Sequence, residues 1–256
     1  MDVLTFLLLA LVGVFSGMIG VTVGGSALIA IPFLMMLGAG PLTAIATNKL
    51  AMISSAAMAS WKYARSGLMQ DWRRLVMPMI LTFVFSWIGA LLVLNIDERV
   101  LTLLVIGLLV LVLLVLVLLP GVGVEPQVRR AGRGQQAKSV LVFAVLGLYM
   151  GFFGPGYGTF AIFGLIYVYG LTFVSSSAVM NLLTLSGLLS SVGVFVMTAS
   201  IDYALAIPLT VGVAIGGWLG AHLAVLKGNV WLKRALIGIT LVLIANLFWT
   251  RVLPGL

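Results

Sequence analysis

The chain contains no cysteine and only one histidine, His222, among its 256 residues. The lack of cysteine excludes disulfides, thiolate catalysis and cysteine-ligated metals, and a single histidine excludes a metal site built from several histidines. Asp and Glu together number only six, and all lie in polar stretches or at the ends of apolar segments. No predicted span therefore carries the carboxylate that proton or sodium coupling uses. We expect no cofactor and no metal, and no nucleophile–base pair supports an enzyme.

Apolar residues dominate the composition of the chain. Hydrophobic residues make up 62% of it and charged residues only 8%. A soluble domain of this size cannot bury so much apolar surface. Several runs reach the ~20 apolar residues that cross a bilayer, and 100–119 is the plainest of them. The sequence predicts an integral, multi-span membrane protein. Its net charge of +8 is interpreted as loop charge that sets orientation, not as a nucleic-acid surface.

Two of the apolar segments are interrupted at their centres by glycines. The interruptions read GVTVGG at residues 20–25 and GPGYGT at residues 154–159. Each interrupted segment is too long for one span, so we expect a hairpin with its bend at the glycines and arms of about 15 residues, at ~1.5 Å per residue. Whether the arms are half-spans or tilted full spans is left open. The predicted segments are 3–38, 42–61, 75–94, 100–119, 140–171, 174–197, 203–226 and 230–249.

The two halves of the chain share a pattern of glycines. Gly13, Gly17, Gly20 and Gly24 are each followed 134 residues later by another glycine, up to Gly158. Asn48 and Asn181 correspond after a one-residue slip. Internal repeats are common in transporters. The pattern predicts a first membrane repeat at 1–119, a linker at 120–139 and a second membrane repeat at 140–256.

Loop charge sets the orientation of these repeats. Three loops, at 62–74, 120–139 and 227–234, hold most of the 14 basic residues, and the positive-inside rule makes them cytoplasmic. The second hairpin then enters and leaves on the cytoplasmic face, and by symmetry the first does so outside. The predicted fold is an all-α integral membrane protein of two inverted repeats, each a broken helical hairpin plus three transmembrane helices. The two bends meet near the midplane.

The bends are candidate anion sites. Glycine permits positive φ and a close approach of ligand to backbone, and helix arms that start at a bend present free N–H groups to an anion. An alternative interpretation is that the glycines only allow tight helix packing. The predicted binding residues at the bends are Thr22, Gly24, Gly25, Tyr157, Gly158 and Thr159.

Polar residues inside two spans extend this site. Lys49 is the one basic residue placed within a span, and an intramembrane charge is a functional candidate by default. Snorkelling to the outer surface is the alternative. Asn48 precedes it, and Asn181 lies at a similar depth in the second half, one turn after Ser177. We expect Asn48, Lys49, Ser177 and Asn181 to contribute to binding, and helix capping is the alternative role for Ser177. His222 is interpreted as a packed or snorkelling histidine.

These motifs resemble the sulfite exporter TauE/SafE family. The resemblance rests on the glycines from Gly13 to Gly25 with Pro32, their repetition from Gly147 to Gly158, and Tyr63, Arg65 and Gly67 before Asp71-Trp72. It covers nearly the whole chain. The chain departs from the family at Val21-Thr22-Val23, where smaller residues are common. It also departs in the second half, which has Gly158-Thr159 where the first half has Gly24-Gly25. The resemblance implies outward movement of small sulfur-containing or organic anions such as sulfite, sulfoacetate or other sulfonates.

The sequence therefore predicts a multi-pass transporter of the inner (plasma) membrane that exports a small anion. The membrane potential favours export, because it contributes ~2.3 kcal/mol per charge per 100 mV. An anion channel with the same central site is the alternative. The expected partners are the anion and the lipid bilayer, without nucleic acid, and a homodimer is left open.

Overall fold

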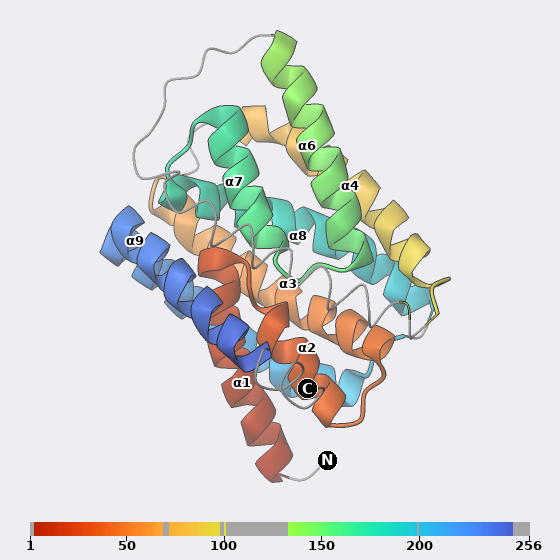
Figure 1. Ribbon diagram of the computed structural model, residues 1–256. Coiled ribbons are helices and arrows are strands. Elements are labelled where there is room, and N and C mark those ends of the chain that lie inside the picture. Colours follow the sequence, from red (N-terminus) through yellow and green to blue (C-terminus); the bar gives the residue numbers. More distant parts are fainter. Residues whose placement is uncertain (1–2, 69–71, 98–99, 101–132, 199, 248–256) are drawn as a thin grey trace.

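The computed structural model describes residues 3–68, 72–97, 100, 133–198 and 200–247. Throughout these residues the regular secondary structure is helical (Figure 1). The predicted segment 100–119 and the linker up to residue 132 lie outside the described residues, apart from Val100. The helices are α1 (Val3–Val23), α2 (Ala27–Met36), α3 (Pro41–Arg65), α4 (Trp72–Val93), α6 (Arg133–Phe152), α7 (Tyr157–Tyr169), α8 (Phe173–Met197) and α9 (Tyr203–Leu247).

Four of these helices are long and apolar enough to cross a membrane. They contain the stretches Val3–Thr22, Leu75–Val93, Phe173–Met197 and Tyr203–Gly228. Large apolar side chains on their outer faces are exposed, as at Leu4 and Phe15 of α1, and a lipid environment accepts such faces. α9 has non-helical φ and ψ at Gly228, between the segments predicted at 203–226 and 230–249. The described part of the chain is therefore all-helical, with four helices that match membrane spans in length and composition.

Both interrupted segments are broken at their glycines. α1 ends at Val23 and α2 begins at Ala27, while α6 ends at Phe152 and α7 begins at Tyr157. The connections use positive φ at Gly24, Gly154 and Gly156, which side chains with a Cβ adopt at a cost of roughly 1–2 kcal/mol. The glycines are therefore required by the backbone path itself.

The two arms of each broken segment differ in length, so the expectation of two arms of about 15 residues is wrong. α1 and α6 have 21 and 20 residues, whereas α2 and α7 have 10 and 13. At ~1.5 Å per residue, only the first arms match the ~30 Å of a hydrocarbon core. Each break therefore joins one full-length helix to one short helix.

α7 folds back along α6. The side-chain amide of Gln135, near the start of α6, donates to the carbonyl of Val168, near the end of α7, over 2.9 Å. The hydroxyls of Ser139 and Tyr169 are 2.8 Å apart. The start of α6 and the end of α7 therefore lie on the same side of the molecule. At the other break, Ser16 of α1 donates to the carbonyl of Ser26 over 3.0 Å.

Small residues join helices from opposite halves of the chain. In α1, a Cβ added at Gly17 would lie 2.6 Å from the Val213 carbonyl oxygen of α9, and one added at Gly13 would lie 2.8 Å from the Leu209 oxygen. The later residue of α1 faces the later residue of α9, so these helices run parallel. α6 packs on α4 in the same way, with Gly151 against Ser86. The packing interpretation of these glycines therefore holds at Gly13, Gly17 and Gly151.

α3 and α8 cross the centre of the molecule, between the α1–α9 pair and the α4–α6 pair (Figure 1). They run antiparallel, because the Tyr63 hydroxyl near the end of α3 lies 3.2 Å from the Ser177 hydroxyl near the start of α8. At the opposite ends, the Lys49 ammonium lies 5.0 Å from the ring centre of Phe195. The residues between these two contacts face each other at the core and form the walls of a cavity.

Candidate functional site

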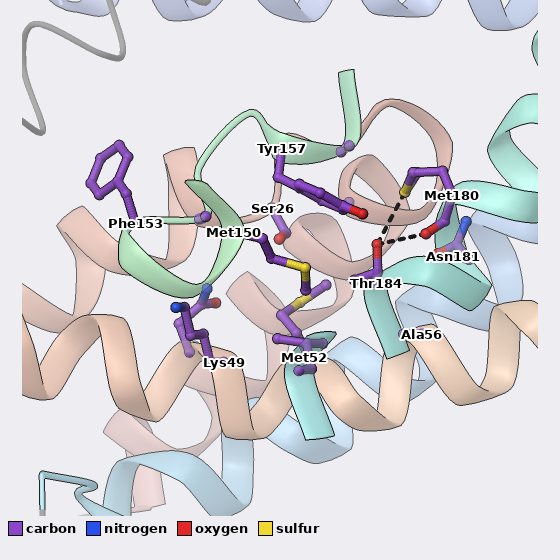
Figure 2. Close-up of a pocket in the computed structure, with 17 residues that line it drawn as sticks. Ser26, Lys49, Met52, Ala56, Met150, Phe153, Tyr157, Met180, Asn181 and Thr184 are labelled. Carbon is purple, nitrogen blue, oxygen red and sulfur yellow. Dashed lines mark hydrogen bonds between the residues drawn. The ribbon is translucent and has the colours of Figure 1, made fainter. Parts of the chain in front are cut away.

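A small cavity lies where the two helix breaks meet α3 and α8. Its volume is about 50 Å³, and it is lined by residues of both breaks together with four residues of α3 within 48–56 and four of α8 within 180–188. Those ranges are close to the middle of each long helix. Figure 2 shows that Ser26, Lys49, Tyr157 and Asn181 surround the same space from four different helices or their ends.

The short helices α2 and α7 begin at this cavity. Ser26 and Ala27 of α2, with Tyr157 and Gly158 of α7, contribute to its lining. Neither helix start has a side-chain cap. By contrast, the Thr172 side chain caps α8. First-turn N–H groups have no partner within their own helix and bear the positive end of its dipole. The Tyr157 N–H donates to the Gly154 carbonyl over 2.9 Å, so at α7 it is mainly the helix dipole that favours an anion at the cavity.

The two breaks touch each other at glycine. A Cβ added at Gly24 would collide with the backbone of Gly158, and a Cβ added at Gly158 would collide with the Cα of Gly24. The same Cβ on Gly158 would lie 3.1 Å from the Met180 sulfur. Close backbone approach is therefore possible only because both positions lack a side chain.

Asn48 contributes an unsatisfied polar group at the cavity. Its side chain is buried, and its Oδ1 has no hydrogen-bond partner among the described residues. A buried polar atom without a partner costs about 1–3 kcal/mol, so such an atom at a cavity wall indicates a ligand or a water. Because the amide oxygen and nitrogen are assigned from their surroundings, either end of the group can face a ligand.

Asn181, the counterpart of Asn48, is already engaged. Its Nδ2 donates to the carbonyl of Val21 over 2.9 Å and to that of Ser177 over 2.8 Å. The Ser177 hydroxyl also donates to the Val21 carbonyl, over 2.8 Å. These groups satisfy carbonyls at the end of α1, which a helix end leaves without partners. Equivalent asparagines thus serve different purposes in the two halves.

Lys49 is buried with its ammonium directed at the end of α6. Only 3% of the residue is exposed, its Nζ donates to the carbonyl of Gly151, and it lies over the Phe195 ring. The C-terminal end of a helix carries partial negative charge, and an aromatic face attracts a cation. Its side chain does not reach the surface of the protein, so snorkelling does not describe this conformation.

The ten residues expected to bind a ligand divide into two sets. Those that line the cavity are Gly24, Asn48, Lys49, Tyr157, Gly158 and Asn181. Thr22, Gly25, Thr159 and Ser177 are buried outside its lining. Thr22 donates back to Met18 and Ile19 of its own helix, over 2.8 and 3.2 Å.

Sequence reasoning missed three methionines and one threonine of the cavity wall. Met52 and Met150 extend into the space in Figure 2, with Met180 and Thr184 beside it. Met52 lies four residues after Asn48, and Thr184 lies three residues after Asn181, so helical spacing from the asparagines could have found both. The thioether groups make this wall polarizable and adaptable.

The helical spans, the two breaks and the central cavity define an integral membrane protein with the features of a transport protein. A family model for "Sulfite exporter TauE/SafE" matches residues 9–247, and the chain belongs to this family. The protein is therefore a membrane transporter of the TauE/SafE family.

Curated relatives match over most of their length. A "Probable membrane transporter protein" of Haemophilus influenzae is 27% identical over 94% of this chain and 93% of its own length. The "Probable membrane transporter protein YfcA" of Escherichia coli K12 is 28% identical over 93% and 87%. A relative from Sinorhizobium sp, "Probable membrane transporter protein ORF9", is 27% identical over 91% and 88%. No solved structure matches the chain.

Proposed function

We propose that this transporter exports a small anion, a sulfur-containing oxyanion such as sulfite or a small sulfonate, held between the two breaks near the bilayer midplane. The observation that carries the proposal is that two helix starts without side-chain caps converge on one cavity with Asn48, whose Oδ1 has no partner among the described residues. Each helix start contributes roughly half a positive charge. Among the described residues, the cavity lining includes Lys49 and no carboxylate, so its charge complements an anion.

The size of the cavity favours the smaller candidates. A volume of about 50 Å³ holds a few water-sized groups, which corresponds to an oxyanion with few heavy atoms. A longer sulfonate such as sulfoacetate requires the walls to move apart. The methionine side chains, which are unbranched and flexible, make that wall the part of the cavity most able to adapt.

The helix pairing supports two inverted repeats, at 1–119 and 140–256, joined by a linker at 120–139. α1 pairs with α9 of the second half, and α6 pairs with α4 of the first. The corresponding helices α3 and α8 run antiparallel, as a two-fold axis in the membrane plane requires. Transporters built this way hold substrate at the repeat interface and alternate between two faces.

Charge supports an inner-membrane orientation in which the C-terminal end of α3 and the start of α6 lie in the cytoplasm. Lys62 and Arg65 lie in the last turn of α3, and Lys138 lies near the start of α6. The described acidic residues Asp97 and Asp202 follow α4 and precede α9, at the opposite ends. This distribution agrees with the positive-inside rule.

Substitution of Lys49 tests the binding site. Purified protein is titrated with sulfite by calorimetry, and Lys49→Met is expected to bind at least roughly tenfold more weakly, since a hydrogen bond to a charged group contributes ~1.5–3 kcal/mol. Lys49→Arg should retain part of the affinity, because it keeps the charge but changes the donor geometry. Lys138→Met, which removes a lysine outside the cavity lining, is the matched control.

A purely structural role for Lys49 predicts a different result. If the ammonium only holds the end of α6, Lys49→Met lowers the unfolding temperature while the folded protein binds sulfite as tightly as the parent. That outcome removes Lys49 from the site. Flux measurements in liposomes separate the channel alternative, because a transporter saturates with sulfite concentration and a channel passes far more ions per second.

A further inference from the structure

A cluster of cations and aromatic rings lies away from the cavity, where α3 ends beside α9. It consists of Trp61, Lys62 and Arg65 on α3 with Trp218 and His222 on α9, and we call it the cation–aromatic cluster. α3 ends at Arg65 and the apolar part of α9 ends at Gly228. The cluster therefore lies near one boundary of the membrane-spanning region.

Ring contacts hold the cluster in a defined shape. The Arg65 guanidinium lies 4.4 Å from the ring centre of Trp61, and the Lys62 ammonium lies 5.8 Å from that of Trp218. The Trp218 and His222 rings stack with centres 5.3 Å apart and an angle of 5° between their planes. Because Lys62 and Trp218 belong to different helices, the contacts orient two cationic groups across the α3–α9 junction.

The cluster lacks an anionic partner within the described part of the chain. Of the described carboxylates, Asp97 follows the end of α4 and Asp202 precedes the start of α9, so that Asp202 lies at the other end of α9 from the cluster. The Nδ1 atom of His222 is buried without a hydrogen-bond partner. Trp61 is 47% exposed and Trp218 is 36% exposed. Two cations and two partly open indoles thus lie together near the membrane boundary, above a buried ring nitrogen that has no partner.

We propose that the cation–aromatic cluster binds the phosphate headgroup of an anionic phospholipid in the leaflet where α3 ends. Tryptophan prefers the headgroup level of a bilayer. The forked guanidinium of arginine matches a phosphate group, while the acyl chains of the lipid cover the exposed indole faces. The bound lipid bridges α3, which carries Asn48 and Lys49, to α9. This site is independent of the transported anion.

Quenching of tryptophan fluorescence by brominated lipids tests the proposal. The full chain in detergent is mixed with brominated phosphatidylglycerol or with brominated phosphatidylcholine of the same acyl chains. We expect half-maximal quenching at a severalfold lower mole fraction of phosphatidylglycerol. Trp218→Phe should remove a large part of that high-affinity quenching, which assigns the signal to the cluster among the six tryptophans of the chain.

Charge removal and its control complete the test. Lys62→Gln and Arg65→Gln should each weaken the phosphatidylglycerol preference by about fivefold, which corresponds to the ~1 kcal/mol that one basic residue contributes near an anionic surface. Lys138→Gln removes another lysine that lies over a ring, 5.5 Å from the centre of Tyr167, and should leave the preference unchanged.

Three results would overturn the proposal. The first is equal quenching by the two lipids, and the second is an equal effect of Lys138→Gln, which indicates general surface charge. The third is competition by millimolar inorganic phosphate that abolishes the preference, which indicates a site for free phosphate.

Discussion

Three glycine substitutions separate backbone strain from contact between the helix breaks. Gly38→Ala introduces strain alone, because Gly38 has φ +93° and a Cβ there would meet no atom within 4 Å. Gly158→Ala introduces collision alone, because its Cβ would meet the Gly24 backbone and no positive φ occurs at Gly158. Gly24→Ala introduces both, since Gly24 has φ +78° and faces Gly158.

The magnitudes follow from these differences. Positive φ costs a residue with a Cβ roughly 1–2 kcal/mol, which is the whole effect expected for Gly38→Ala. Overpacking costs about 1–3 kcal/mol, and Gly158→Ala should reach the upper part of that range because a backbone cannot rotate away. Gly24→Ala combines the two terms, about 2–5 kcal/mol. Each kcal/mol lowers the unfolding temperature by roughly 2–4 °C in proteins near this size.

Thermal unfolding in detergent and sulfite flux in liposomes are measured on the same preparations. Gly38→Ala should lose a little stability and keep its flux, because Gly38 lies away from the cavity. Gly158→Ala should lose flux even where it remains folded, because separating the breaks displaces the helix starts that line the cavity. If Gly158→Ala matches the parent in both measurements, the breaks do not meet as closely as described and the central site is wrong.

Two further predictions concern orientation and the asparagines. Single cysteines are placed at Ser66, Gln136 and Met197 of this cysteine-free chain. The first two should react with a membrane-impermeant thiol reagent from one side of the membrane, and the third from the other side. Labelling of all three from one side contradicts the inverted arrangement. Asn48→Leu should weaken sulfite affinity severalfold with little loss of stability, because the Asn48 Oδ1 is unpaired. Asn181→Leu should mainly lower the unfolding temperature, because it releases the end of α1. Equal effects of the two variants on affinity would show that both asparagines contact the anion.

The spans and the positions of the breaks could be predicted from the sequence because they depend on local composition. Long apolar runs need a bilayer, and glycines in the middle of such runs interrupt a helix. The structure accordingly breaks one segment at Gly24 and the other at Gly154 and Gly156. Arm lengths could not be predicted this way, since the short arms α2 and α7 end where tertiary contacts and turns end them, as at Gly170 with φ +69°.

The membership of the cavity could be predicted only in part. Asn48, Lys49 and Asn181 were recognisable because polar groups within a span are costly and need a partner. Which partner each one has depends on helices distant in sequence, and Asn181 lies 160 residues from the carbonyl of Val21 to which it donates. Apolar lining residues such as Met52 do not stand out by residue type, because methionine is an ordinary residue in a span, and only the helical spacing from Asn48 points to Met52.

The asymmetry at the centre follows from one requirement that both halves share. Each broken segment leaves unpaired carbonyls at the end of its long arm. In the second half, Ser177 and Asn181 satisfy those of α1. At the spacing that relates Asn181 to Asn48, Ser177 corresponds to Ala44, which has no hydroxyl, and Lys49 corresponds to a leucine.

At the end of α6, a carbonyl therefore accepts a hydrogen bond from the Lys49 ammonium. At the end of α1, the carbonyl accepts from the neutral donors Ser177 and Asn181. Beside the cationic cap of α6, the Asn48 Oδ1 has no hydrogen-bond partner among the described residues. Among the described residues, Lys49 is the one cationic side chain that lines the cavity, and Asn48 lines it too. At this depth the first half therefore carries a cationic side chain and an unpartnered Oδ1, whereas the corresponding asparagine of the second half donates to two carbonyls.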